Sequence, residues 1–324
     1  MKLAFAIVCA SRIAMAEPTA FLDVVPTGGA PAIRATVIAG PHGACTLDGV
    51  AASEERGFDA DEPIAIAIVV NDQELMGAYI GDDNEWDPLD NRGPIDDVKA
   101  AFDRFDFTKL GRGQFTVIGY DTGAHVMRDA APLAQLKGPA FGEHKAYVGK
   151  LGTDLVQGIQ LGLDTLEHAA ATRRVLIVIG DGNDTNNETA VHALAELAHR
   201  ARVLRVEPFA FVRKTAVSSE GAIVDNFTPP VQTPTQQTLE RELAQMMSRL
   251  TDRRTLVFPG ERFTWDGALH VLALACSGGE LGRFELVLAP AWSPPMRSKV
   301  PFVVIGIALA AIAGAVVAMA RRRR

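Results

Sequence analysis

The chain has 324 residues and a formal net charge of −7, from 39 acidic and 32 basic side chains. This acidic balance argues against a nucleic-acid partner, because phosphate binding requires a basic face. The length allows one α/β domain of ordinary size together with a smaller partner domain.

The N-terminus has the three-part pattern of a secretory signal peptide. Lys2 precedes the apolar run 3–10, and small residues occupy positions 14–16. We expect residues 1–16 to be this signal peptide, so that the rest of the chain is exported.

Residues 17–61 predict an N-terminal β segment. The stretch 32–39 is partly alternating and β-branched, and it lies among turns rich in Pro and Gly. This segment also contains Cys45, one of two cysteines that remain after the signal peptide is removed.

Residues 62–258 predict an α/β domain, because buried-strand patterns alternate with amphipathic-helix patterns. Strands followed by helices in this order favour a mostly parallel sheet flanked by helices. We expect strands near 64–70, 115–120, 174–180 and 204–212, and helices near 94–104, 153–169, 188–201 and 239–250.

Two polar segments interrupt this domain. Residues 82–90 form an acidic segment that contains Trp86, and they are a candidate contact surface. Residues 213–238 are rich in Pro, Thr, Ser and Gln, so we expect an insertion that buries little apolar area and runs over the surface.

Residues 259–296 predict a C-terminal β segment. They contain the apolar stretches 268–276 and 283–288, which a Ser-Gly-Gly sequence separates. We expect the two β segments to form a small β-sandwich together. The cysteines Cys45 and Cys276 then form either a disulfide or two separate buried thiols, and the sequence leaves both alternatives open.

The C-terminus predicts a transmembrane helix. Residues 300–320 carry no charge, and four arginines follow at positions 321–324. At about 1.5 Å per residue this run is long enough for the hydrocarbon core of a bilayer. The arginine tail favours a cytoplasmic end, so we expect a single-pass envelope protein with its bulk outside the cytoplasm.

Three polar segments of the α/β domain lie next to predicted strands or helices. Asn71 follows the first strand, Gly152-Thr153-Asp154 begins a helix, and Asp181 and Asp184 follow the strand that ends at Gly180. The carboxyl ends of parallel strands form the ligand crevice in open α/β sheets. We therefore expect these side chains to share one edge.

This order of strands, polar turns and helix start resembles the von Willebrand factor A domain. The segment 115–133 is similar to the family's central strand and hairpin, and 239–258 is similar to its final helix and strand. The resemblance covers roughly residues 62–258, and it implies a binding module whose three loops hold a metal-dependent adhesion site for protein ligands.

The first of these loops departs from the family pattern. The family reads D-x-S-x-S, whereas this chain has Asn71, Gln73 and Leu75, and leucine cannot coordinate a cation. Thr153 and Asp181 match the family's threonine and later aspartate. The metal-site candidates implied by the resemblance are therefore Asn71, Gln73, Thr153 and Asp181, and we expect no metal or only weakly bound Mg²⁺. A one-residue shift would bring Asp72 and Glu74 into the site instead.

The expected function is that of a membrane-anchored extracytoplasmic module for adhesion or for an envelope assembly, with a protein ligand. The chain has no nucleophile elbow, zinc-protease motif, P-loop or Cys-x-x-Cys pair, so we do not expect an enzyme. The alternative is a metal-assisted hydrolase that uses Asp181 and Asp184. Thr153 also has a purely local interpretation as a helix N-cap, and Asp181 one as a turn residue.

Overall fold

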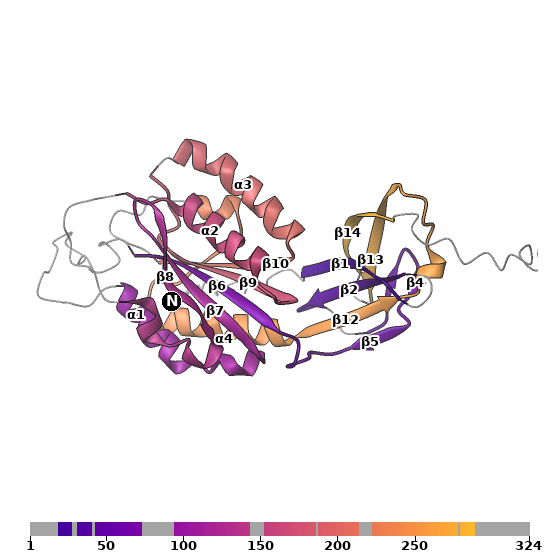
Figure 1. Ribbon diagram of the computed structural model, residues 1–324, viewed down its shortest axis with the longest axis horizontal. Coiled ribbons are helices and arrows are strands. Elements are labelled where there is room, and N and C mark those ends of the chain that lie inside the picture. The colour runs from indigo at the N-terminus through magenta and orange to yellow at the C-terminus, as the bar shows by residue number, and fades with distance from the viewer. Residues whose placement is uncertain are drawn as a thin grey trace, which may run out of the picture. The chain divides into compact units, whose positions relative to one another are not determined.

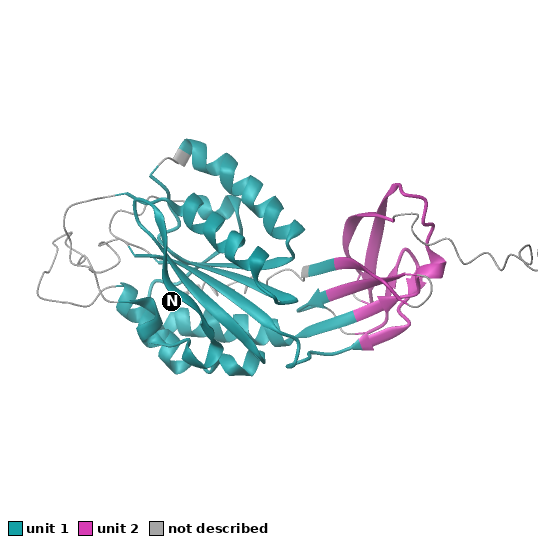
Figure 2. Ribbon diagram, viewed as in Figure 1, with its two compact units in different colours: residues 1–21, 37–40, 56–255 teal, residues 22–36, 41–55, 256–324 magenta. Residues whose placement is uncertain are grey.

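The computed structural model describes residues 19–27, 31–40, 43–72, 94–142, 152–185, 187–213, 222–277 and 279–288. The chain divides into two compact units (Figure 2), one built mainly from residues 56–255 and the other from residues 22–36, 41–55 and the chain after 255. The predicted signal peptide and the predicted membrane span lie outside the described residues. Within the described ranges, no helix is long and apolar enough to cross a membrane.

The larger unit is built around a six-stranded sheet in the order β11-β10-β9-β6-β7-β8 (Figure 1). All neighbouring strands pair in parallel except β7 and β8, which form an antiparallel hairpin. Its strands are β6 (Ile64–Asn71), β7 (Gly113–Tyr120), β8 (Ala124–Pro132), β9 (Arg173–Gly180), β10 (Val206–Val212) and β11 (Pro230–Gln232).

Helices cover both faces of this sheet. In Figure 1, α2 and α3 lie on one side and α1 and α4 on the other. Their bounds are α1 (Pro94–Arg104), α2 (Leu155–His168), α3 (Asn187–Val203) and α4 (Gln236–Thr251). Short 3₁₀ helices are η2 (Phe107–Leu110), η3 (Leu133–Gln135), η4 (Gly138–Phe141), η5 (Ile223–Asn226) and η6 (Gly260–Arg262).

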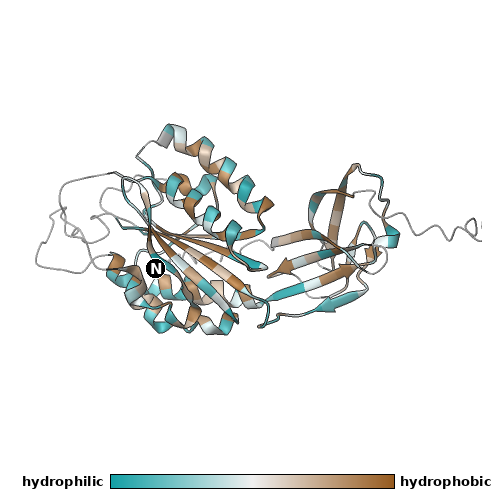
Figure 3. Ribbon diagram, in the orientation of Figure 1, coloured by the Kyte–Doolittle hydropathy of each residue, from teal (hydrophilic) through white to brown (hydrophobic). Residues whose placement is uncertain are grey.

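The alternating sizes of the residues in β6 explain how two helix layers fit on one strand. All eight of its residues are buried, as expected for a central parallel strand (Figure 3 shows its apolar character). Its isoleucines belong to the core beneath α1 and α4, whereas Ala65, Ala67 and Val69 belong to the core beneath α2. Gly162 of α2 packs against Val69, and an added Cβ there would approach the valine side chain to 3.0 Å. Small residues on both partners therefore let α2 lie close to the sheet.

The main elements of this unit agree with the sequence predictions. The four expected strands correspond to β6, β7, β9 and β10, and the four expected helices to α1 through α4. The prediction that residues 213–238 bury little apolar area was wrong for the described part of that segment. Val224 and Phe227 are 0% and 6% exposed, and β11 pairs with β10. A few well-placed apolar residues are enough to anchor a segment whose average composition is polar.

The flanks of the chain form two four-stranded sheets, β1-β2-β12-β5 and β14-β13-β3-β4. The predicted segments 17–61 and 259–296 meet in the second sheet, whereas the first sheet takes its later strand from residues 253–258. The strands are β1 (Thr19–Val25), β2 (Ala32–Ile38), β3 (Cys45–Leu47), β4 (Val50–Ala51), β5 (Glu54–Arg56), β12 (Arg253–Phe258), β13 (Leu269–Cys276) and β14 (Gly279–Val287).

One strand belongs to a different sheet from the one expected. The resemblance made the segment that ends at Phe258 the last helix and strand of the α/β domain. The helix is α4, but β12 pairs in the flanking sheet between β2 and β5. Its burial alternates along the strand, which suits a sheet with one exposed face better than a central parallel strand.

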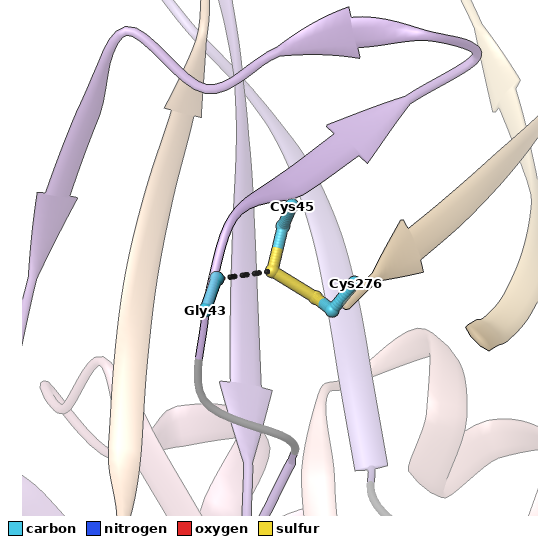
Figure 4. Close-up of a disulfide and its surroundings, with 3 residues drawn as sticks. All are labelled: Gly43, Cys45 and Cys276. Atoms are coloured by element: carbon cyan, nitrogen blue, oxygen red, sulfur yellow. Dashed lines mark hydrogen bonds between the residues drawn. A yellow bond between two sulfur atoms is a disulfide. The ribbon is translucent and has the colours of Figure 1, made fainter. Parts of the chain in front are cut away.

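Cys45 and Cys276 form a disulfide (Figure 4). Cys45 of β3 and Cys276 of β13 are directly opposite each other in the antiparallel pair, with their Cα atoms 4.0 Å apart. Of the two alternatives that the sequence left open, the structure therefore has the covalent one. The bond joins residues that are 231 positions apart.

The amino end of the six-stranded sheet buries charged side chains that have hydrogen-bond partners. Glu207 of β10 accepts a 2.6 Å hydrogen bond from Arg249 Nε of α4. Arg173, the first residue of β9, is 3% exposed and donates to the backbone carbonyls of Leu110 and Leu250. Burial raises the pKa of Glu207, and burial together with the nearby Arg253 lowers the pKa of Arg173 to about 10.

Candidate functional site

The carboxyl ends of β6 and β9 bring two of the predicted site residues into contact. These strands are parallel neighbours, with Val70 opposite Ile179, so the residues that follow meet at one edge. Asn71 is 1% exposed, and its Nδ2 donates to Asp181 Oδ1 across 3.1 Å. We call this edge, formed by Asn71, Thr153 and residues 181–185, the carboxyl edge.

Tyr120, the last residue of β7, packs beside the residues that form this contact. Tyr120 is fully buried, and its hydroxyl lies against Gly180, where an added Cβ would approach it to 2.2 Å. The same Cβ would lie 2.8 Å from Cβ of Asn71. The last position of β9 therefore requires glycine. Burial, and then the nearby Asp181, raises the pKa of Tyr120 well above its ordinary value, so this group stays a neutral phenol.

Asp181 is a partly buried carboxyl group. Burial raises the pKa of its carboxyl, and hydrogen bonds from Asn183 and Asn71 partly oppose this rise. The backbone N–H of Asn183 lies 3.4 Å from Oδ1, so the turn interpretation of Asp181 also holds. Gly182 follows with a φ of 76°, in the left-handed region that glycine adopts most readily.

Thr153 is joined to the loop that follows β9. Its backbone N–H donates to Thr185 Oγ1 at 2.6 Å, and its carbonyl accepts from the N–H of Thr185 at 2.8 Å. These two bonds hold the loop before α2 against the loop after β9. The structure thus places Thr153 at the same edge as Asp181.

Two carboxylates accept hydrogen bonds from backbone N–H groups in the first turn of α2. Asp154, not Thr153, is the N-cap and accepts from the N–H of Gln157 at 2.9 Å. Asp184, which is 7% exposed, accepts from the N–H of Val156 at 3.2 Å. Two backbone N–H groups in the first turn of α2 therefore have carboxylate partners. Asp184 stabilises the positive end of the helix from another loop.

The remaining candidates lie outside the described residues or away from the main contact. Gln73, Glu74 and Leu75 are outside the described part, as is the acidic segment 82–90. Asp72 is 8% exposed, and its Oδ2 lies 3.3 Å from Nε2 of His125 on β8.

Sequence reasoning did not identify Tyr120 or Thr185 as members of this edge. Both residues lie at the ends of correctly predicted elements, but nothing in their spacing shows where their side chains reach. Tyr120 is on β7, and its hydroxyl reaches Gly180 at the end of β9, although β6 lies between these two strands. This contact can be predicted only when the order of the strands is known.

A basic side chain also lies at this end of the sheet. Arg213 follows β10, donates its backbone N–H to the carbonyl of Gly180, and is 1% exposed. Its guanidinium forms a 2.7 Å ion pair with Asp97 in the first turn of α1. This buried pair fixes the beginning of α1 to the end of β10.

Two of the carboxylates at this edge already have hydrogen-bond partners within the protein. A hard divalent cation needs about six oxygen ligands with carboxylate charge. Here the Asn71 amide directs an N–H at Asp181, and Asp184 accepts a backbone N–H. Within the described ranges, no three His, Cys, Asp or Glu residues are grouped to hold a metal ion.

Comparison with known proteins found no matching family model and no match among curated proteins. Solved structures with a similar fold include von Willebrand factor A domain proteins. BatB from Bacteroides thetaiotaomicron is 15% identical with a TM-score of 0.44, covering 58% of this chain and 98% of that one. The von Willebrand factor type A protein from Catenulispora acidiphila is 12% identical with a TM-score of 0.42, covering 84% and 73%. The vWF domain of the pilus tip protein Mfa5 from Porphyromonas gingivalis is 10% identical with a TM-score of 0.42, covering 58% and 95%.

Proposed function

We propose that this protein is an envelope-anchored interaction module, for adhesion or for a scaffold, that binds a protein ligand at its carboxyl edge without a resident metal ion. The observation that carries this proposal is the direct hydrogen bond from Asn71 to Asp181. The amide N–H of Asn71 satisfies Oδ1 of this carboxylate from within the protein.

The loops of the carboxyl edge are already joined to one another. The contacts Asn71–Asp181 and Thr153–Thr185, together with the bond from Val156 to Asp184, connect the ends of β6 and β9 with the start of α2. A preorganised surface of this kind loses little conformational entropy when it binds a ligand. Recognition then depends on hydrogen bonds and on the charge of Asp181.

The placement in the envelope derives from the sequence. The export pattern at residues 1–16 and the uncharged segment 300–320 support a chain held by its C-terminus with the carboxyl edge outside the cytoplasm. Fractionation of cells, with protease added from outside, tests this placement. Resistance of the whole chain to protease in intact spheroplasts would contradict it.

Quantitative capture of envelope proteins by the full chain in nanodiscs tests the binding role. Capture should be unaffected by a chelator. Asp181→Asn should weaken it at least about tenfold, the effect of an interface residue that contributes about 1.4 kcal/mol. The matched control is Asp129→Asn on exposed β8, which should leave capture unchanged. Equal capture by wild type and Asp181→Asn would contradict the use of this edge.

The hydrolase alternative makes a different prediction. It requires turnover that is abolished both by a chelator and by Asp181→Ala. In this structure each of the two carboxylates of that alternative, Asp181 and Asp184, already accepts a hydrogen bond from the protein. We therefore propose binding without turnover.

A further inference from the structure

Three side chains with different metal-binding atoms lie beside the carboxyl end of β7. Asp72 follows β6, and its backbone N–H donates to the carbonyl of Tyr120, the last residue of β7. His125 and Met127 belong to β8, the antiparallel partner of β7. We call Asp72, His125 and Met127 the hairpin triad. The triad adjoins the carboxyl edge but shares no residue with it.

Gly119 of β7 leaves the space that the triad faces. A Cβ added at Gly119 would lie 2.8 Å from Met127 Sδ and 2.9 Å from Asp72 Oδ2. His125 is directly opposite Gly119 in the antiparallel pair, so the two residues share one face of the hairpin. The imidazole Nε2 of His125 is 3.3 Å from the same Asp72 Oδ2. A thioether sulfur, a carboxylate oxygen and an imidazole nitrogen therefore gather at one place.

A β-bulge positions the methionine of the triad. The cross-strand partners of Ile118 and Val117 are Val126 and Arg128, so Met127 is the additional residue of the bulge. Bulges redirect side chains and are common next to functional sites. The sulfur of Met127 is therefore placed by an irregularity of the backbone that uniform strand pairing would not give.

The spacing of the donor atoms fits two ligands of one metal ion. Nitrogen and oxygen ligands lie about 2.0–2.2 Å from a tetrahedral ion, which places two of them about 3.3–3.6 Å apart. The distance of 3.3 Å between His125 Nε2 and Asp72 Oδ2 lies in this interval. It is longer than the roughly 2.7–2.9 Å of a close charge-assisted hydrogen bond. The two groups thus have the separation of neighbouring ligands.

The chemistry of the three donors favours copper. Mg²⁺ and Ca²⁺ take oxygen ligands, so a thioether contributes nothing to their binding. Zn²⁺ is bound by thiolate, imidazole and carboxylate. A methionine sulfur is a soft ligand that selects copper(I), and imidazole also suits copper. Met127 is therefore the residue that distinguishes a copper site from a site for a harder ion.

The triad is open to solvent on one side. The side chain of His125 is 45% exposed, whereas that of Asp72 is 5% exposed. Met127 is partly buried and packs against the core beneath α1 and α4. A metal ion can thus enter past the imidazole and be held from the interior by the carboxylate and the sulfur. A further coordination position remains accessible to water.

We propose that the hairpin triad binds one copper ion through His125 Nε2, Met127 Sδ and Asp72 Oδ2. This site is separate from the three loops that the family resemblance implies for a metal. It is also independent of ligand binding at the carboxyl edge, so either proposal can fail without the other.

Copper titration of the full chain in nanodiscs tests the site. The parent protein carries Cys9→Ser and no polyhistidine tag, so that neither this thiol nor the tag binds the metal. Copper(I) is kept reduced with ascorbate, and its affinity is measured by competition with bicinchoninate. The parent should bind one copper(I) ion per chain. Met127→Leu keeps the approximate volume but removes the sulfur, and it should weaken binding at least about tenfold, equivalent to about 1.4 kcal/mol.

Matched control variants change the same residue types outside the triad. Met247→Leu alters another partly buried methionine, which belongs to α4. His192→Gln alters an exposed histidine whose Nε2 is 3.4 Å from a carboxylate oxygen of Glu196. Both variants should keep the parent's affinity, whereas His125→Gln should weaken binding as Met127→Leu does.

X-ray absorption at the copper edge separates ligation by Met127 from a merely structural role. The parent should show a copper–sulfur contribution that is lost in Met127→Leu. No copper binding by the parent, or an affinity and spectrum that are equal in the parent and Met127→Leu, would overturn the proposal. If Met127→Leu alters the circular dichroism, His125→Gln at its more exposed position replaces it, and an unchanged affinity there would count equally against the site.

Discussion

The two ends of the six-stranded sheet both bury polar side chains, but they neutralise them differently. At the amino end, Glu207 faces Arg249, and Arg173 donates to two backbone carbonyls. At the carboxyl edge, Asp181 accepts a hydrogen bond from the neutral amide of Asn71. Among the described residues, Glu207 at the amino end is therefore met by a cation, whereas Asp181 is met by neutral donors at the edge where α/β sheets bind ligands.

This difference separates a structural role from a binding role. A buried ion pair holds two elements together but offers nothing to a ligand, because each charge already has its partner. A half-buried carboxylate whose pKa is raised by burial gains more from an incoming donor or cation than a solvated one does. We therefore assign stability to the amino end and recognition to the carboxyl edge.

The largest effect should come from breaking the amino-end pair. Arg249→Met leaves the carboxylate of Glu207 buried without its hydrogen-bonded cation and should lower the free energy of unfolding by about 3–5 kcal/mol. Urea unfolding measures this change. Arg104→Met is the matched control, because Arg104 forms an ion pair with Glu240 at 65% side-chain exposure. That control should cost no more than about 1 kcal/mol. Equal losses in the two variants would contradict the structural role of the amino end.

Removing the amide at the carboxyl edge should have a smaller effect. Asn71→Leu keeps the approximate volume but leaves Asp181 without the amide donor, so unfolding should become easier by about 1–3 kcal/mol. The comparison variant is Asn226→Leu, since Asn226 also donates its amide, to the carbonyl of Ile223, but is exposed. Its cost should stay below about 1 kcal/mol. If Asn71→Leu lowers the free energy of unfolding no more than Asn226→Leu does, the contact between Asn71 and Asp181 does not stabilise the fold.

The central strands of the six-stranded sheet could be predicted from the sequence. The run Ile64–Val70 has no polar residue, and such a run predicts a strand covered on both faces. The meeting of Asn71 with Asp181 followed from the same reasoning, since residues after neighbouring parallel strands share an edge. Both results depend on local pattern together with one general rule of sheet topology.

Pairing between distant segments could not be read from the sequence. The pattern of β12 predicts a strand but not its partners, and those partners include β2 from the other end of the chain. The three-residue strand β11 is too short to give a periodic signal. The reach of Tyr120 beneath β6 depends on the order of strands and on the glycine at position 180.

The stability of the carboxyl edge should depend on pH in a definite direction. Burial raises the pKa of Asp181 above its ordinary value of 3.8, so the folded protein binds this proton more tightly than the unfolded chain. Its contribution to stability is therefore greatest at low pH and falls as the pH rises through the interval between the two values. Asp181→Asn, which cannot ionise, should gain stability relative to wild type over that interval and keep a constant advantage above it. Urea unfolding at pH 3.5 to 7 measures this difference, and an advantage that shrinks with rising pH would contradict the assignment.

Thermal unfolding in the presence of Mg²⁺ tests the central claim most directly, because a carboxyl edge closed by its own hydrogen bonds needs no cation. Wild type should show the same melting temperature in MgCl₂ and in NaCl of equal ionic strength. Asn71→Asp sets a second carboxylate beside Asp181 and should gain about 1.4 kcal/mol at an Mg²⁺ concentration about ten times its Kd. A specific stabilisation of wild type by Mg²⁺ that disappears in Asp181→Asn would contradict the account.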